Sequence, residues 1–213
     1  MNILVTAGAT REPIDPVRHL TNRSSGRRGY ALADAGAQQG HRVTLISGPT
    51  SLDIPINVDF VSVETAREMM EAVKIHIKGT DAAIFAAAVA DYRPASFSET
   101  KLKNAEEPHS LERVQNPAIL GSARRQLDYG GVLVGFAAET ENLEGNAREK
   151  LRQKHCDLIV ANDVSRKGVG FDSELNEVLL VYPGHTLPLP KDRKERLAHA
   201  ILEAVDELRI RKG

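Results

Sequence analysis

Seven apolar runs of strand length, separated by segments with helical spacing, constrain the fold most. The runs cover residues 2–6, 42–46, 58–63, 82–88, 132–136, 157–161 and 177–182. Most are continuously apolar, which is typical of parallel strands covered by helices on both faces. Helical periodicity lies between them, at residues 25–39, 65–77, 117–128, 142–154 and 192–211. The alternation predicts an α/β fold, a Rossmann-like doubly wound and mostly parallel sheet.

Two stretches break this alternation. Residues 89–116 are polar, contain Pro94 and Pro108 and show no clear period. A long irregular loop of this kind in a compact domain is usually a lid or a binding loop. Residues 165–190 are rich in Gly and Pro around an apolar run, which predicts a β-hairpin appendage. We find no linker or internal repeat, so residues 1–213 are expected to form a single domain.

The charge balance excludes several classes of partner. The chain has 28 Lys and Arg residues and 29 Asp and Glu residues. Its net charge therefore creates no overall electrostatic field that would attract nucleic acid or an anionic membrane. No apolar run reaches the ~20 residues that a spanning helix needs. The start of the chain has no signal-peptide pattern. We therefore expect a cytoplasmic enzyme with neither nucleic-acid nor membrane partners.

Cysteine and histidine usage also limits the chemistry. Cys156 is the single cysteine, so no internal disulfide can form, and its apolar surroundings predict a core position. The seven histidines are scattered, and neither a zinc motif nor a nucleophile elbow is present. A covalent or zinc mechanism has no support, and no metal ligands can be assigned.

A turn of small residues follows the first predicted strand and includes Gly8 and Thr10. In a doubly wound sheet, a phosphate can approach the backbone at this turn. A tight turn without a ligand is the alternative interpretation. The glycine spacing GxGxxG of dinucleotide-binding proteins is missing, which argues against a dehydrogenase.

The next helix start has the composition of an anion site. Ser24 and Ser25 are good N-cap residues, Gly26 follows them, and Arg23, Arg27 and Arg28 are near. Free backbone N–H groups at a helix start attract anions. Simple capping without a ligand is the alternative.

Five further side chains are candidates for a nucleotide site. Asp91 ends an apolar run and could bind ribose hydroxyls or a metal, although an Asx turn also explains it. Lys101 lies in the long loop, from which it could close over a polyphosphate or simply be solvated. Lys150 and Lys154 share one helix face. Phe136 could stack on a base or pack in the core.

The order of the motifs resembles the phosphopantothenoylcysteine synthetases. GATREPIDPVRHLTNRSSG, at residues 8–26, is similar to the family's opening signature GGTxEPxDPVRxxxNxSSG. Later segments resemble family motifs in the same order: AAVADYRP (87–94), KLKN (101–104), NPAIL (116–120), VGFAAET (134–140), AREKLRQKHCDLIVAND (147–163) and GFDSELNEV (170–178). The similarity covers nearly the whole chain.

The resemblance implies a ligase of coenzyme A biosynthesis that joins 4'-phosphopantothenate to L-cysteine. It implies CTP as the substrate nucleotide, favoured over ATP, together with Mg²⁺ and a homodimer. Asn22 is implied as the residue needed for amide formation, with Lys101 as a second catalytic residue. The nucleotide site is expected to include Gly8, Thr10, Ser24, Ser25, Gly26, Asp91, Lys101, Asn116, Pro117, Ala118, Ile119, Phe136, Lys150 and Lys154.

The sequence departs from the family pattern in places. Asn104 stands where the family often has Lys, and Ala118 where it often has Asp. Many bacterial members are fused to a flavin-dependent decarboxylase, and no such half is present in this sequence. A stand-alone enzyme and an excised domain both remain possible at this point.

The implied chemistry has two steps. The substrate carboxylate attacks the α-phosphate of CTP, giving an acyl-cytidylate and pyrophosphate, and the cysteine amine then displaces CMP. Two other functions stay open: a non-catalytic Rossmann sensor of nucleotides, and an NAD(P)-dependent oxidoreductase. The sensor would bind CTP without releasing pyrophosphate, and the oxidoreductase should carry the missing glycine fingerprint.

Overall fold

A computed structural model describes residues 1–103, 110–163 and 175–212 of the chain. The departure at Asn104 and the first glycines of the predicted hairpin segment, Gly168 and Gly170, lie outside these ranges.

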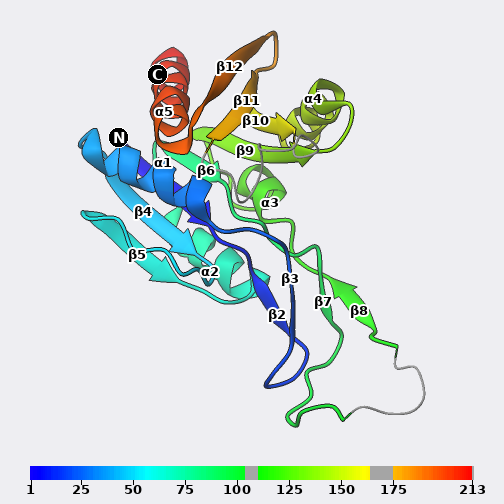
Figure 1. Cartoon of the computed structure of the whole chain (residues 1–213). Helices are drawn as coiled ribbons and strands as arrows, with labels where there is room; N and C mark the ends of the chain where they lie inside the picture. The colour runs from blue at the N-terminus through cyan, green and yellow to red at the C-terminus, as the bar shows by residue number, and fades with distance from the viewer. Residues whose placement is uncertain (104–109, 164–174, 213) are drawn as a thin grey trace.

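The core of the molecule is an eight-stranded, mainly parallel sheet (Figure 1). Its strands, in spatial order, are β12 (Thr186–Arg193), β11 (Leu175–Val181), β10 (Leu158–Asp163), β9 (Val132–Glu139), β6 (Ala82–Phe85), β1 (Asn2–Ala7), β4 (Arg42–Ser47) and β5 (Val58–Ser62). All neighbours from β10 to β5 pair in parallel, while β10–β11 and β11–β12 are antiparallel. The predicted doubly wound α/β fold is confirmed.

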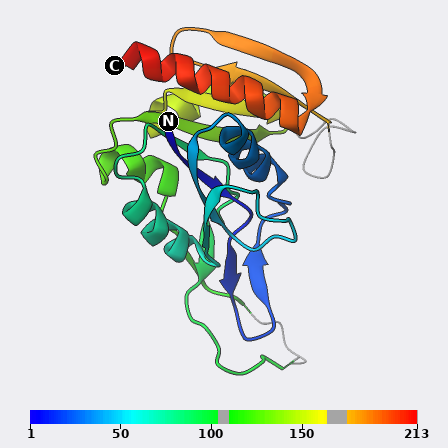
Figure 2. The same cartoon turned by 90° about the vertical axis from the view of Figure 1, so that its left-hand side faces the viewer.

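Helices cover both faces of this sheet, as the continuous apolar runs require. The buried side chains of α1 (Arg27–Gln38) and α5 (Lys194–Lys212) join one hydrophobic cluster. Those of α2 (Ala66–His76), α3 (Ile119–Arg125) and α4 (Leu143–Lys154) join the other, and Figure 2 shows the two layers edge-on. Along β1, Ile3 and Val5 face the first cluster and Leu4 the second. None of these helices is long and apolar enough to cross a membrane.

Strand order locates the place where a ligand can enter. From β1 the chain continues to β4 and β5 on one side, then returns to β6 on the other side of β1. Such a reversal opens a crevice at the carboxyl ends of the strands. Gly29 brings α1 against this edge, because a Cβ there would lie 2.5 Å from the Cβ of Ala7.

The predicted hairpin near the C-terminal end forms, and it continues the central sheet. Strand β11 pairs with β12 and also with β10. Val178, Leu180 and Val181 are at most 4% exposed, since the chain's own core covers them. These side chains are therefore not available as apolar surface for a partner, and the hairpin is part of the sheet rather than an appendage.

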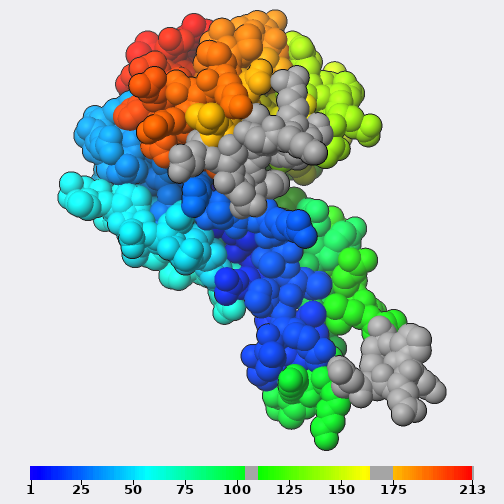
Figure 3. All heavy atoms as spheres, viewed as in Figure 1, coloured from blue at the N-terminus to red at the C-terminus, as the bar shows by residue number. Residues whose placement is uncertain are grey.

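Two short antiparallel ladders project from the carboxyl end of the sheet as an arm (Figures 1 and 3). One pairs β2 (Arg11–Pro13) with β3 (His19–Thr21), and the other pairs β7 (Tyr92–Pro94) with β8 (Arg113–Gln115). The sequence suggested that residues 89–116 are irregular throughout, but part of this segment forms β7 and β8. Their pairing joins positions 19 to 23 residues apart, which no local period reveals.

The opening signature holds the arm to the rest of the molecule. Glu12 is 1% exposed, and its Oε1 accepts a hydrogen bond of 2.9 Å from the first backbone N–H of α2, at Ala66. Asp15 accepts hydrogen bonds from Arg18 and from the backbone N–H of Leu102. The Arg18 guanidinium holds the pKa of Asp15 well below its usual range. Glu12 thus connects the arm to α2, and Asp15 connects two segments within the arm.

Candidate functional site

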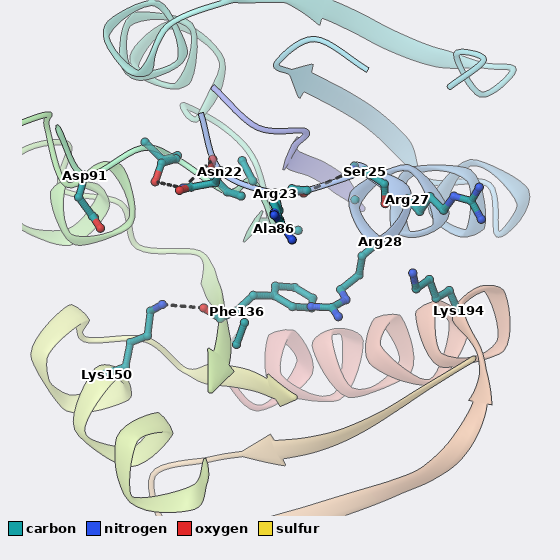
Figure 4. A pocket seen from close by; sticks show the side chains of 17 residues that line it. Asn22, Arg23, Ser25, Arg27, Arg28, Ala86, Asp91, Phe136, Lys150 and Lys194 are labelled. Atoms are coloured by element: carbon teal, nitrogen blue, oxygen red, sulfur yellow. Dashed lines mark hydrogen bonds between the residues drawn. The ribbon is translucent and has the colours of Figure 1, made fainter. Parts of the chain in front are cut away.

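A cavity of about 500 Å³ lies at the carboxyl ends of β1, β6 and β9, next to the start of α1 (Figure 4). Its walls come from the loop before α1, the loop after β6, the end of β9, α4 and the start of α5. The lining residues are Asn22–Gly29, Ala86–Val89, Asp91, Phe136, Ala138, Lys150 and Lys194. We call it the first pocket.

A second pocket of about 270 Å³ adjoins the first and shares Asp91, Phe136 and Lys150 with it. Its other walls are residues 115–121, at the start of α3, and Lys154 of α4. The strand-length run 82–88 ends as a strand at Phe85. The residues that follow it therefore form a loop that lines both pockets.

The start of α1 differs from the prediction in its cap. Gly26 is the N-cap residue, in a left-handed conformation, and no side-chain cap is present among the described residues. Ser24 and Ser25 therefore do not serve as N-caps. A Cβ on Gly26 would lie 2.7 Å from Cγ2 of Thr50, so glycine fits both the conformation and the space. Within the described part of the chain, the start of α1 thus lines the first pocket without a side-chain cap from its N-cap residue.

Asn22 bridges two segments far apart in the sequence. Its Nδ2 donates to the backbone oxygens of Val89 at 3.1 Å and Ala88 at 3.4 Å. These bonds fix the loop before α1 against the loop after β6. The amide nitrogen must exchange one of these bonds before it can donate to a substrate.

Two lysines of α4 face the second pocket, as their spacing predicted. The Nζ of Lys150 donates to the backbone oxygen of Phe136 at 2.7 Å. Burial lowers the pKa of the Lys150 ammonium. The side chain of Lys154 lies over Gly121, whose missing Cβ leaves it room. Both cations thus lie beside the aromatic wall of Phe136.

The segment at the start of α3 is held by hydrogen bonds to the loop after β6. The backbone N–H of Asn116 donates to the backbone oxygen of Asp91 at 2.8 Å, and its side-chain Nδ2 donates to the backbone oxygen of Ala90 at 2.9 Å. Arg93 donates in turn to Oδ1 of Asn116. Pro117, Ala118 and Ile119 therefore present a fixed wall to the second pocket.

Three predicted site residues lie outside both pockets. Thr10 is fully buried, and its Oγ1 accepts a hydrogen bond from the Ala90 N–H at 3.0 Å. Gly8 has a positive φ of 74° and lies against the backbone of Gly48. Lys101 is exposed on the arm, next to the residue that Asp15 holds. A role for Lys101 at the pocket requires the segment that carries it to move.

The structure adds two cations that the sequence analysis did not select as site residues. Arg28 lies over the ring of Phe136, with its Cζ 5.3 Å from the ring centre. Lys194 is 6% exposed and enters from the start of α5, more than 160 residues later in the chain. The argument from helix capping placed Arg28 near an anion site, but no local signal links Lys194 to this edge.

Metal ligands are not concentrated in the described residues, where no three His, Cys, Asp or Glu side chains come together. Among the described residues that line the two pockets, Asp91 is the one carboxylate. Mg²⁺ characteristically uses one or two carboxylates together with substrate phosphates and water. The site therefore fits a Mg²⁺ ion that arrives with a triphosphate better than a metal held by protein ligands alone.

Comparison with known protein families gives a match over residues 1–208 to the DNA/pantothenate metabolism flavoprotein C-terminal domain. The chain belongs to this family. The resemblance to phosphopantothenoylcysteine synthetases is thereby confirmed at the level of the family.

Curated relatives of this family are named coenzyme A biosynthesis bifunctional protein CoaBC. The protein of Vibrio vulnificus strain YJ016 is 46% identical over 209 residues, which are 97% of this chain and 52% of the relative. That of Bacillus subtilis strain 168 is 42% identical and covers 100% of this chain and 52% of the relative. The chain spans about half the length of these relatives.

Solved structures share the fold. The C-terminal domain of a CoaBC protein is 40% identical, with a TM-score of 0.82 and coverage of 97% of this chain and 94% of that one. A flavoprotein of Streptococcus pneumoniae has a TM-score of 0.83 at 23% identity, covering 98% and 99% of the two chains. The second shows the fold alone.

Proposed function

We propose that this chain is a phosphopantothenate–cysteine ligase that uses CTP. The observation that carries the proposal is the pair of adjoining pockets, which places Asn22 and the uncapped start of α1 beside Phe136 and two lysines. Family membership and relatives named for coenzyme A biosynthesis support it.

The first step activates a carboxylate, because a carboxylate oxygen is too poor a leaving group to be displaced by an amine. A carboxylate oxygen of 4'-phosphopantothenate attacks the α-phosphorus of CTP. The bond to the bridging oxygen breaks, and pyrophosphate leaves with its electron pair. The products of this step are the acyl-cytidylate and pyrophosphate.

The two pockets divide the nucleotide between them in this proposal. The base lies in the second pocket against Phe136 and the wall at residues 116–119, and the triphosphate extends into the first pocket towards α1. Lys150 lines both pockets and would therefore lie near the α-phosphate that the carboxylate attacks, with Lys154 one helical turn away in the second pocket. Their positive charge reduces the repulsion between the two reactants. Mg²⁺, bound with the triphosphate, would supply further charge neutralisation.

The second step forms the amide. The neutral amine of L-cysteine attacks the acyl carbon, CMP leaves, and the nitrogen loses a proton. Negative charge grows on the acyl oxygen during the attack, so a hydrogen-bond donor is required there. The amide nitrogen of Asn22 lies at the pocket wall and can serve by exchanging its bond of 3.4 Å to Ala88.

The proposal includes a homodimer in the cytoplasm. Exposed apolar side chains gather on the arm, where Val17, Phe97 and Leu102 are 61%, 52% and 45% exposed. An apolar cluster on a projecting element is typical of an association surface. A second copy of the chain is the partner that we propose for it.

Pyrophosphate release tests the function. The enzyme is supplied with Mg²⁺, 4'-phosphopantothenate and L-cysteine, together with either CTP or ATP. We expect amide product and one pyrophosphate per product, with a higher kcat/KM for CTP. Equal or better turnover with ATP would contradict the assignment of the base pocket. CTP binding without pyrophosphate release would instead identify a nucleotide sensor.

A further inference from the structure

Arg28 directs its guanidinium group into the wall of the first pocket. In Figure 4 it reaches from α1 across the ring of Phe136, with Lys194 beside it. Its Nη1 donates to Oδ1 of Asn162 on β10 at 3.0 Å. Asn162 is fully buried, so this hydrogen bond holds the guanidinium against the floor of the sheet.

The contact between Arg28 and Asn162 leaves two buried donors unused. Nε of Arg28 and Nδ2 of Asn162 are inaccessible to solvent and have no hydrogen-bond acceptor among the described residues. A buried donor without an acceptor destabilises the folded state, and more so when the donor is charged. Native proteins supply such donors with a partner, which can be a ligand. Arg28 lines the first pocket and Asn162 does not, so an acceptor in this pocket would bind the guanidinium that Asn162 holds in place.

The charge at this place favours an anion. Burial lowers the pKa of Arg28 to about 10, which still leaves the guanidinium charged at neutral pH. No ion pair to Arg28 is formed within the described part of the chain. The uncapped start of α1 adds its partial positive charge, and Lys194 lines the same pocket.

We propose that Arg28, held in place by Asn162, forms a subsite for phosphate oxygens, which the terminal two phosphates of the nucleotide occupy before they leave as pyrophosphate. The proposal rests on the function proposed above. Phe136 supports it, because its ring borders the second pocket and also lies under Arg28. A triphosphate that extends from the second pocket past Phe136 reaches this guanidinium. The 4'-phosphate of the acyl substrate is the other possible source of the same oxygens.

Binding measurements on the Arg28→Met variant test the subsite. Methionine keeps an apolar side chain over Phe136 but removes the charge and the donors. By calorimetry, pyrophosphate should bind about tenfold more weakly or worse, because one hydrogen bond to a charged group contributes about 1.5–3 kcal/mol. CMP, which lacks the terminal phosphates, should bind as tightly as it does to the wild type.

Arg42→Gln is the matched control. Arg42 is an exposed arginine at the amino end of β4, at the opposite edge of the sheet from the pocket, and its loss should change neither affinity. Calorimetry with pyrophosphate needs no turnover. A chain that binds pyrophosphate through Arg28 but makes no amide would refute the proposed function and keep this subsite.

A second measurement distinguishes the two sources of phosphate. If Arg28→Met weakens 4'-phosphopantothenate about tenfold and leaves pyrophosphate unchanged, the subsite holds the 4'-phosphate. Unchanged affinity for both ligands would overturn the proposal. Equal losses of affinity for CMP and for pyrophosphate would overturn it too, because they would show that Arg28 acts only by supporting the ring of Phe136.

Asn162→Asp gives an independent test should Arg28→Met fold poorly. The new carboxylate would pair with the guanidinium and take the place of the bound anion. Pyrophosphate should then bind about tenfold more weakly, without a fall in the thermal unfolding midpoint. Wild-type affinity for pyrophosphate in this variant would count against the subsite.

Discussion

Asn22 is the residue whose contacts bear most directly on the chemistry. Asn22→Asp replaces a donor by a carboxylate that faces the oxygens of Ala88 and Val89. Loss of one donor at a developing oxyanion typically costs ~3 kcal/mol, about a hundredfold in rate. We expect about a hundredfold slower amide formation, while the first step, which depends more on the lysines, suffers less.

Rapid quenching with labelled CTP measures the two steps of Asn22→Asp separately. The variant should release one pyrophosphate per site and accumulate the acyl-cytidylate. Complete loss of pyrophosphate release in a folded variant would instead assign Asn22 to activation or to substrate binding.

Lys150 predicts a pH dependence. Burial lowers its pKa, so its positive charge is lost at a lower pH than that of an ordinary lysine. The kcat/KM for CTP reports the free enzyme and should therefore fall early on the alkaline side. Lys150→Arg keeps its charge at these pH values and should move this fall to higher pH. Lys78→Arg, on an exposed turn, is the control and should leave the pH profile unchanged. If Lys150→Arg also leaves the profile unchanged, Lys150 does not contribute to nucleotide binding.

At the scale of elements, the arm segment that carries Lys101 must move if Lys101 acts at the pocket, as the resemblance implies. Asp15 and Arg18 hold its neighbour Leu102 through both backbone groups. If the segment closes over the triphosphate, Lys101→Gln should slow pyrophosphate release about a hundredfold, as expected for a lost charge stabiliser.

The matched control for Lys101→Gln is Lys103→Gln, which removes an exposed lysine two residues along. Circular dichroism should show both variants folded. Wild-type pyrophosphate release from Lys101→Gln would leave Lys101 as an ordinary surface residue.

For the whole molecule, the arm is the proposed site of self-association. The main-chain bond of 3.0 Å from Ser98 to Ile14 brings the segment with Phe97 against the turn with Val17. Sedimentation at micromolar concentration should show a dimer for the wild type. Val17→Asp with Phe97→Asp should shift it to monomer, because a charge in an apolar interface is costly. Ile75→Asp, at an exposed position on α2, is the control and should remain dimeric. Sedimentation of the wild type as a monomer would contradict the proposed dimer.

Most of the layered fold could be predicted from the sequence. Continuous apolar runs specify strands buried on both faces, and spacings of three and four specify helices that cover them. The core position of Cys156 followed in the same way: it is 5% exposed, and burial raises its pKa to about 12. Lys150 and Lys154 were placed on one face because helical geometry is local.

Contacts between distant segments were decided only by the tertiary structure. The bridge from Asn22 to Val89, the capping of α2 by Glu12 and the burial of Arg28 on Asn162 join residues 54 to 134 positions apart. Local periodicity records which side chains avoid water, but not which buried surfaces meet. Strand order and helix packing decide that. They placed Arg28, which lies beside a predicted anion site, against Asn162 and left its Nε without an acceptor among the described residues.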